Sequence, residues 1–365
     1  MDPFKSTTIG AKKVRNRLVM APMTTYSGNP DCTPSDEELT YYAKRSKTVG
    51  TVISAAIAVN NEAHAFERQI SLENDSFIAP MARLADAIKK EGAVAIAQLH
   101  HGGRMNDPSL YEDGREILAP SAVKAPREDK VKPRAMTLEE VKRTIQDFID
   151  AAIRARKAGF DGVEIHGANT YLLQQFFSAH SNKRSDAYGS SVENRLRFID
   201  EIVNGVLALK DDHPDFVVGY RLSPEEIEDD GITLEDTDAL VDHLAEKPLD
   251  YIHLSLRHYA QTSMRDPEET IPVVSRLKAR MPASMPLIAS GGLDTSEDLL
   301  HSGKLGASFF ALGTALLADP EAGKTLERQG EVVKTFHKMT LPKPLYARLK
   351  NNQSVFEGKG FSFSD

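Results

Sequence analysis

Cysteine occurs only once in this 365-residue chain, at position 32. A single cysteine cannot form an intramolecular disulfide, and it cannot supply the thiolates of an iron–sulfur cluster or a structural zinc site. This scarcity excludes both kinds of centre and is typical of proteins kept in a reducing compartment. We therefore expect a cytoplasmic protein, and we assign no function to Cys32, which lies in a polar stretch between two prolines.

Long apolar runs and an excess of positive charge are also missing. No apolar run approaches the roughly 20 residues of a membrane-spanning helix, and the first residues lack the basic and then apolar pattern of a secretion signal. The formal net charge is −8, from 53 acidic and 45 basic residues. Nucleic acid and membranes are therefore not expected as partners.

No internal repeat or low-complexity segment interrupts an alternation of short apolar runs with longer segments of helical period. This alternation predicts βα units around a parallel sheet. We predict strands at 18–20, 51–56, 94–98, 162–166, 217–222, 251–255, 286–290 and 308–312. Eight strands close a (β/α)8 TIM barrel, so the predicted fold class is α/β with a single barrel domain.

Helices are predicted between the strands, at 35–47, 75–91, 137–158, 191–209, 234–245, 269–280, 295–301 and 319–329. Several begin with a residue that favours the N-cap position. Thr137 followed by Glu140 predicts a capping box, and Ser191 predicts a hydroxyl cap. Asp294 and Asp319 are expected to cap the last two helices, the second with proline at its first position.

Two stretches fall outside the eight units. Residues 106–136 form a long polar connection after the third strand, and they are expected to be either a lid over the site or a plain excursion. Residues 331–365 form a C-terminal tail that is expected to pack on the barrel of residues 1–330 or on a neighbouring subunit. We expect a homo-oligomer.

The most informative segment is the turn after the fourth predicted strand, which contains His166, Asn169 and Tyr171. In α/β barrels the carboxyl ends of the strands carry the chemistry. Two side-chain N–H donors could bond one developing oxyanion, and a phenol could protonate a carbon. These are the groups needed to reduce an activated double bond, and we predict that these three residues are catalytic.

Polar or glycine-containing sequences also follow other predicted strands. Arg221 ends the fifth strand and Gln98 the third. The ends of the seventh and eighth strands are the positions where barrels commonly bind phosphate, through backbone N–H groups and a helix N-terminus. Those ends contain Ser290, Gly291, Gly292, Gly313 and Thr314.

Over residues 4–330 the chain resembles the old yellow enzyme family of FMN-dependent ene-reductases and NAD(P)H:flavin oxidoreductases. Each motif alone is weak, but their order and spacing together are specific. The motifs are Asn16-Arg-Leu18, Ala21-Pro-Met23, Gln98-Leu-His-His-Gly-Gly-Arg104, Gly159-Phe-Asp-Gly-Val-Glu-Ile-His-Gly-Ala168, Tyr171-Leu-Leu-Gln-Gln-Phe176, Ser191-Val-Glu-Asn-Arg195 and Arg221-Leu-Ser223.

The resemblance implies FMN as cofactor and NADPH or NADH as hydride donor. Thr24 would lie near the O4/N5 edge of the flavin, Gln98 would bond its pyrimidine edge, and Arg221 would face N1 and C2=O. The phosphate would be held at the ends of strands seven and eight. The full set implied for the cofactor is Ala21, Pro22, Met23, Thr24, Ala56, Gln98, Arg221, Ser290, Gly291, Gly292, Gly313 and Thr314.

Two positions depart from patterns found in the family. Arginine often follows the glycine of the eighth strand and binds the FMN phosphate, whereas this chain has Thr314. A hydroxyl is a weaker partner than a charge-assisted pair, so we expect weaker FMN retention than is usual in the family. Thr24 stands where one branch has cysteine, so redox gating by a thiol at that position is excluded.

The implied reaction is ping-pong reduction of an enone, a nitroalkene or a quinone-like electron acceptor. His166 and Asn169 would bind the oxygen of this small molecule and Tyr171 would protonate it, with Tyr26 lining the substrate pocket. Two alternatives stay open: an FMN-binding sensor or general NAD(P)H oxidase, and a flavin-free barrel lyase or isomerase. The latter would need a strand-end base such as lysine, and no predicted strand ends in lysine.

Several histidines need a separate interpretation. We expect His100, His101 and Arg104 to support the turn after the third strand, and we predict no metal site because no carboxylate or third histidine has suitable spacing. His258 and Tyr259 follow the sixth strand and could reach the rim of the pocket.

Overall fold

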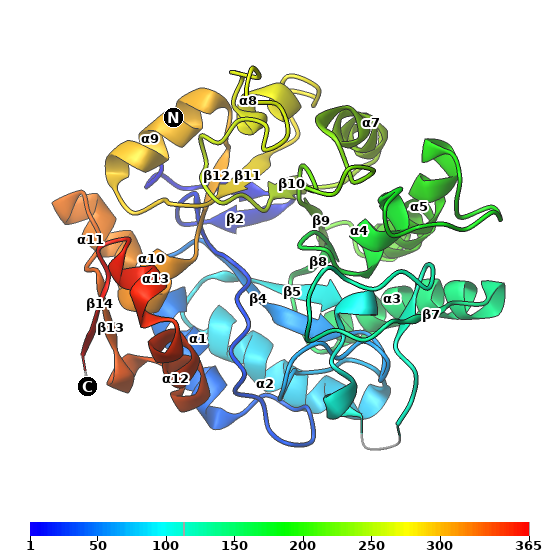
Figure 1. Cartoon of the computed structure of the whole chain (residues 1–365). Helices are drawn as coiled ribbons and strands as arrows, with labels where there is room; N and C mark the ends of the chain where they lie inside the picture. Colours follow the sequence, from blue (N-terminus) through cyan, green and yellow to red (C-terminus); the bar gives the residue numbers. More distant parts are fainter. Residues whose placement is uncertain (112–113, 365) are drawn as a thin grey trace.

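The computed structural model describes residues 1–111 and 114–364, and it contains a closed barrel of eight parallel strands (Figure 1). The fold class predicted from the sequence is confirmed, and all eight strands lie where they are predicted, to within two residues at each end. The strands are β3 (Leu18–Met20), β4 (Thr51–Ala58), β5 (Val94–His100), β8 (Gly162–Gly167), β9 (Val217–Leu222), β10 (Tyr251–Leu254), β11 (Leu287–Ser290) and β12 (Phe309–Leu312).

A hairpin that the sequence analysis did not identify closes the amino end of the barrel. Its strands are β1 (Thr7–Ile9) and β2 (Lys12–Val14). Ile9 and Val14 belong to one buried cluster with Val94 and Val217, which are the first residues of β5 and β9. Apolar side chains therefore fill this end, and the carboxyl end is the one left for ligands.

Helices surround the barrel in the order that the alternation predicts (Figure 1). Each strand buries both of its faces, as in parallel sheets covered by helices; all eight residues of β4 are buried. The eight expected helices are α1 (Asp36–Ser46), α2 (Ile78–Lys89), α3 (Leu138–Lys157), α5 (Val192–Leu207), α7 (Leu234–Ala245), α8 (Val273–Lys278), α9 (Ser296–Leu305) and α11 (Ala322–Gln329).

The structure confirms two predicted helix caps and corrects two others. Thr137 and Glu140 form a capping box, and the Ser191 hydroxyl caps α5. Asp294 does not cap α9, because the Thr295 hydroxyl accepts the N–H of Asp298 and takes that position.

The predicted start of the last barrel helix at Asp319 is also wrong. The Asp319 carboxylate accepts the N–H of Glu321 at 2.8 Å in a turn that precedes the helix, and α11 begins at Ala322. Helix α8 is shorter than predicted at both ends, because it begins only after Pro272 and ends at Lys278.

Short elements absent from the predicted set occupy the connections. Helix α4 (Leu172–Phe177) follows the turn after β8, α6 (Leu209–Asp212) follows α5, and α10 (Thr314–Ala318) follows β12. Before α2 there is one 3-10 turn, η1 (Asp75–Phe77), and after β5 there are two, η2 (Gly103–Met105) and η3 (Pro108–Leu110).

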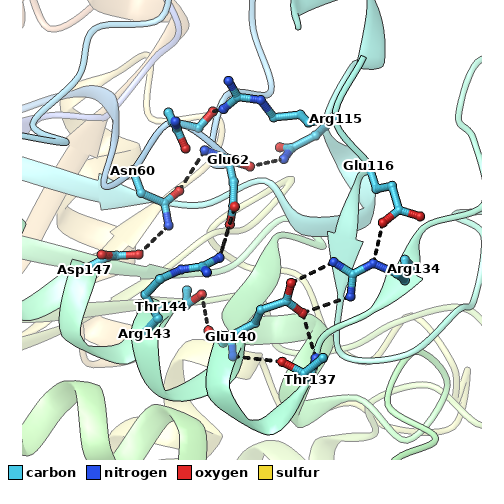
Figure 2. A network of polar contacts seen from close by, with 12 residues as sticks. Asn60, Glu62, Arg115, Glu116, Arg134, Thr137, Glu140, Arg143, Thr144 and Asp147 are labelled. Carbon is cyan, nitrogen blue, oxygen red and sulfur yellow. Dashed lines mark hydrogen bonds and ion pairs between the residues drawn. The ribbon is translucent and has the colours of Figure 1, made fainter. Parts of the chain in front are cut away.

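The polar excursion after β5 contains a small parallel pair, β6 (Leu118–Ala119) and β7 (Arg134–Ala135). Figure 2 shows how the Arg134 side chain joins two carboxylates, Glu116 at 2.6 Å and Glu140 at 2.7 Å. Since Glu140 lies in the first turn of α3, this arginine attaches the excursion to that helix.

Further polar contacts join α3 to the loop after β4 (Figure 2). Arg143 of α3 pairs with Glu62 at 2.8 Å, and Asn60 donates to Asp147 at 2.6 Å. The excursion, α3 and this loop therefore form one polar network at the side of the barrel. That the excursion acts as a lid stays a prediction.

The C-terminal tail forms β13 (Thr335–His337), η4 (Lys338–Thr340), α12 (Lys343–Asn351), α13 (Gln353–Glu357) and β14 (Ser362–Ser364). In Figure 1 these orange and red elements lie beside α10, α11 and α1. The backbone N–H of Lys343 donates to Glu37 of α1 at 2.8 Å, and Arg45 donates to the carbonyl of Thr340 at 3.1 Å. The tail thus packs on the barrel of its own chain.

Candidate active site

Five rings from four segments meet at the carboxyl end of the barrel. The centroids of His166 and Tyr171 are 5.1 Å apart, and His100 lies 4.4 Å from Tyr171. Phe66 lies 5.9 Å from Tyr171 and 6.0 Å from Tyr26. The structure therefore brings the predicted residues His166, Tyr171 and Tyr26 together, and it adds His100 and Phe66, which sequence reasoning did not assign to the site.

His166 is held as a neutral imidazole with a defined tautomer. Its Nδ1 accepts the backbone N–H of Ala168 at 3.2 Å, so the ring proton is on Nε2. Burial, together with the nearby His100 and Arg221, lowers the pKa of His166 well below its usual value. The Nε2–H is therefore available as a hydrogen-bond donor at neutral pH.

Asn169 lies three residues further along the same turn, in a strained backbone. Asn169 and Thr170 have φ values of 57° and 65°, in the left-handed region that a threonine rarely adopts. The Oδ1 atom of Asn169 accepts from the hydroxyls of Ser255 at 2.8 Å and Ser223 at 3.4 Å. With Oδ1 held in this way, the exposed side-chain amide presents its Nδ2 hydrogens as donors.

Arg221 connects this turn to the interior of the barrel end. It pairs in register with His166 across β8 and β9, and its Nη2 donates to Ser255 at 3.0 Å. Its Nε is buried and has no hydrogen-bond partner within the part of the chain that the structure describes. A charged guanidinium with a spare buried N–H is suited to a ligand that carries negative charge.

A second buried network joins the predicted residue Gln98 to Glu164 and His253, which were not predicted for the site. Glu164 accepts from Gln98 Nε2 at 2.7 Å and from His253 Nδ1 at 2.8 Å, and both Glu164 and His253 are fully buried. Burial acts to raise the pKa of Glu164, but His253 and Arg221 outweigh it and the pKa lies below its usual value. The sequence signal was a carboxylate inside an otherwise apolar strand.

A cavity of about 680 Å³ opens beside Arg221, and its volume suits a small-molecule ligand or cofactor. Nine of the twelve residues predicted to bind the cofactor line it. They are Ala21, Pro22, Met23, Arg221, Ser290, Gly291, Gly292, Gly313 and Thr314.

The other three predicted cofactor residues lie elsewhere at the same barrel end. Ala56 and Gln98 are buried neighbours in register on β4 and β5, and Gln98 is in turn the register neighbour of Glu164. Thr24 is half-buried in the loop after β3. None of the three lines the cavity beside Arg221.

The turn after β11 needs glycine. Gly291 has a φ of 102°, and a Cβ there would lie 2.7 Å from the carbonyl oxygen of Leu256. The Ser290 hydroxyl is already used by the fold, because it donates to the carbonyl of Leu254 at 2.7 Å. The cavity wall at this point is therefore formed largely by backbone.

The other residues discussed in the sequence analysis, at the ends of the third and sixth predicted strands, line the cavity, support a turn or bond to a helix. His258 lines the cavity, whereas Tyr259 does not and instead donates to Asp298 at 3.1 Å. His101 supports its own turn as expected, since its Nδ1 accepts the N–H of Gly103 at 3.1 Å. Arg104 also joins this turn to α4, through its backbone N–H and Gln175 at 3.0 Å.

Comparison with known proteins identifies the family to which this barrel belongs. The model of the NADH:flavin oxidoreductase / NADH oxidase family matches residues 2–331. The chain belongs to this family, and the resemblance to the old yellow enzyme family inferred from its motifs is confirmed.

Relatives of this chain differ in length. The probable NADH-dependent flavin oxidoreductase YqiG of Bacillus subtilis is 40% identical and is matched over 93% of both chains. The NADH:fumarate oxidoreductase of Klebsiella pneumoniae and the NADH:acrylate oxidoreductase of Vibrio harveyi are also 40% identical. The chain spans 36% of the first of these two longer proteins and 31% of the second.

Solved structures show the same architecture. Morphinone reductase superposes with a TM-score of 0.79 at 28% identity, with 91% of each chain covered. The old yellow enzyme homologue from Zymomonas mobilis superposes with a TM-score of 0.78 at 25% identity, over 91% of this chain and 94% of that one.

Two other kinds of feature are absent from the described residues. Across 1–111 and 114–364, no three His, Cys, Asp or Glu side chains are grouped so that they could hold a metal ion. Over the same residues, no helix is both long enough and apolar enough to cross a bilayer.

Proposed function

We propose that this oxidoreductase binds FMN, takes hydride from NADH or NADPH, and reduces the activated C=C bond of a small-molecule acceptor in a ping-pong reaction. The observation that carries the proposal is the pair of oriented donors in one turn. His166 Nε2–H and Asn169 Nδ2–H each remain available because the other polar atom of the same side chain is already bonded. The Tyr171 phenol, the proposed proton donor, lies beside His166.

The residues around the cavity fit FMN. Bound FMN supplies a two-electron carrier that passes hydride from the nicotinamide to the acceptor. Arg221, with its unpartnered buried Nε, would face the N1 and C2=O edge, where a fixed positive charge favours the reduced form. Ala21 to Thr24, Ala56 and Gln98 would surround the ring system, and Ser290, Gly291, Gly292, Gly313 and Thr314 would face the phosphate end.

On the acceptor, His166 and Asn169 would bind the carbonyl or nitro oxygen and stabilise the negative charge that develops there. Tyr171 would donate its proton to the α-carbon. Desolvation raises the pKa of Tyr171 above its usual range, so the phenol is fully protonated at neutral pH and can act as a general acid. Tyr26, joined to this group through Phe66, would line the acceptor pocket.

The test is an anaerobic titration of the purified protein with NADH and NADPH, followed by a panel of enones, nitroalkenes, quinones and unsaturated carboxylates. We expect a yellow protein that is bleached by at least one nicotinamide and recovers its colour with at least one activated alkene. A colourless protein would favour a flavin-free lyase or isomerase. A yellow protein that is bleached but reoxidised only by oxygen would favour a general oxidase.

Replacing the proposed acid separates the two half-reactions. Tyr171→Phe should leave the rate of flavin reduction by the nicotinamide near wild type and lower the rate of alkene reduction on the order of 10²-fold, because only the second step needs a proton on carbon. Stopped-flow absorbance at the flavin band measures both rates. Equal loss in both half-reactions would contradict the assignment of Tyr171 as the proton donor.

A further inference from the structure

The C-terminal tail forms part of the wall of the cofactor cavity. Phe356, Lys359 and Phe361 line it together with the glycine turn after β11 and with Thr314 at the start of α10. In the sequence, Lys359 lies 45 positions beyond Thr314. The tail therefore brings a cation, Lys359, to the cavity that Thr314 also lines, and Thr314 is the position where the family often has arginine.

The segment around Lys359 is a tight turn fixed on both sides. The backbone N–H of Phe361 donates to the carbonyl of Phe356 at 3.0 Å, and Ser362 donates to Lys334 at 2.8 Å. Between them, Gly360 adopts a φ of 81°. The backbone position of Lys359 is therefore fixed by the hydrogen bonds of this turn.

An aromatic cluster fixes this turn to the rest of the tail. Phe361 is 2% exposed and stacks on the fully buried Phe336 of β13, with ring centroids 5.3 Å apart. Phe356 meets the same ring at 5.2 Å, and Phe363 meets it at 4.9 Å. Because β14 also pairs with β13, the wall that the tail contributes is held in place by packing and by a strand ladder.

Three lysine or arginine side chains line this cavity, and one of them, Arg221, donates to Ser255. Lys359 from the tail and Arg257 from the loop after β10 both line it, and within the described residues neither side chain forms a hydrogen bond or ion pair. The carboxylate in the same lining is Asp294. Burial raises the pKa of Asp294, and the positive charges of Lys334 and Lys359 act in the opposite direction.

We infer that Lys359, together with Arg257, binds the phosphate of FMN and supplies the positive charge that Thr314 does not. The inference rests on the proposed function, because it assigns a cation to one end of the proposed cofactor. A phosphate monoester is doubly charged near neutral pH and recruits lysine and arginine as partners. The C-terminal tail is then part of the cofactor site. The expectation of weak FMN retention was drawn from position 314 alone and did not include a cation from the tail.

The experiment compares two ligands that differ only in the phosphate. Apoprotein is titrated with FMN and with riboflavin, and the dissociation constants are measured by flavin fluorescence for wild type, Lys359→Met, Arg257→Met and the matched tail control Lys338→Met. Lys338 is exposed and does not line the cavity. We expect Lys359→Met to weaken FMN binding about five- to tenfold while riboflavin binding changes less than about twofold.

Two further readouts test the charge directly. The FMN affinity of wild type should fall with added salt more steeply than that of Lys359→Met, since one screened ion pair has been removed. Lys359→Arg should restore most of the affinity. The apoprotein melting temperatures of wild type and Lys359→Met should agree, which separates phosphate binding from damage to the tail.

The outcomes separate this inference from the proposal on which it rests. If wild type binds FMN tightly and Lys359→Met binds FMN and riboflavin as wild type does, the inference is overturned while the proposed function stands. Equal weakening of FMN and riboflavin would also overturn it, because the lysine would then act on packing. If wild type binds neither flavin, the proposed function fails.

Discussion

At the scale of single residues, the candidate site works by committing one polar atom of each side chain and leaving another available. His166 commits Nδ1 to the backbone of Ala168, Asn169 commits Oδ1 to Ser255, and Arg221 commits Nη2 to the same Ser255 hydroxyl. Ser255 thus connects the cation proposed to face the flavin with the amide proposed to hold the acceptor. This serine was not among the residues predicted from the sequence.

Ser255 should therefore act as a positioning residue. Ser255→Ala removes the donor that fixes Asn169 Oδ1, so the amide loses its preferred orientation. We expect the kcat/KM for alkene reduction to fall about five- to tenfold, the value of one hydrogen bond to a partly buried polar group. Flavin reduction by the nicotinamide should change less.

Stopped-flow measurement of both half-reactions checks this, and Ser255→Thr, which keeps the hydroxyl, should recover most of the loss. An Ala variant with unchanged alkene reduction would mean that Ser223, which also contacts Asn169, is sufficient to hold the amide.

At the scale of elements, the fold was predictable where the signal is local. The strands and helices of the barrel follow from apolar runs and cap residues that lie within a few positions of one another, as Thr137 and Glu140 do. The hairpin β1–β2 and the short pair β6–β7 were missed. Each of these strands has only two or three residues, too few to show a strand pattern, and each forms by pairing and packing within the folded chain. The start of α11 was also mispredicted, because the Asp319 carboxylate can accept a backbone N–H either as a helix cap or in a separate turn, and in the structure it does so in a turn.

The excursion after β5 gives a prediction at this scale. Arg134→Met removes the contacts to Glu116 and Glu140 that attach the segment to α3 (Figure 2). These side chains are partly exposed, so the global free energy of unfolding should fall by only about 1 kcal/mol or less. Local opening should increase, and chymotrypsin should cleave within residues 106–136 several times faster than in wild type.

Arg127→Met is the matched control for that experiment, because Arg127 lies in the same segment and, among the described residues, forms its ion pair with the near neighbour Asp129. Cleavage that is equally fast in both variants, or unchanged in both, would show that Arg134 does not hold the excursion.

At the scale of the whole molecule, one buried carboxyl group, Glu38, affects the stability of the fold and also contacts a loop at the carboxyl end of the barrel. Glu38 of α1 is 1% exposed, caps the start of its own helix and accepts the hydroxyl of Thr25 in the loop after β3. Burial raises the pKa of Glu38 to about 7. Helix α1 is therefore connected to the loop after β3 through a carboxyl group whose pKa is about 7.

The pH dependence of folding follows from that pKa. The usual pKa of the group is 4.5, so between 4.5 and about 7 the native state holds a proton that the unfolded chain has lost. Stability from this group is thus present at low pH and decreases as the pH rises through this window, by about 3 kcal/mol in total. Glu38→Gln removes the titration.

Urea unfolding of both proteins at several pH values between 4.5 and 8 measures this. The stability of Glu38→Gln relative to wild type should increase with pH across the window. A difference between the two proteins that does not vary with pH would contradict the raised pKa.

The sequence by itself determined the barrel, the order of its strands and the turn that contains His166, Asn169 and Tyr171, because these depend on residues close together in the chain. Only the tertiary structure decided which distant groups complete the site. Ser255 is 86 positions from Asn169, and His253 is 89 positions from Glu164. Closure of the barrel brings such pairs together, and packing of the tail brings Lys359 to the cavity, so no local pattern could reveal them.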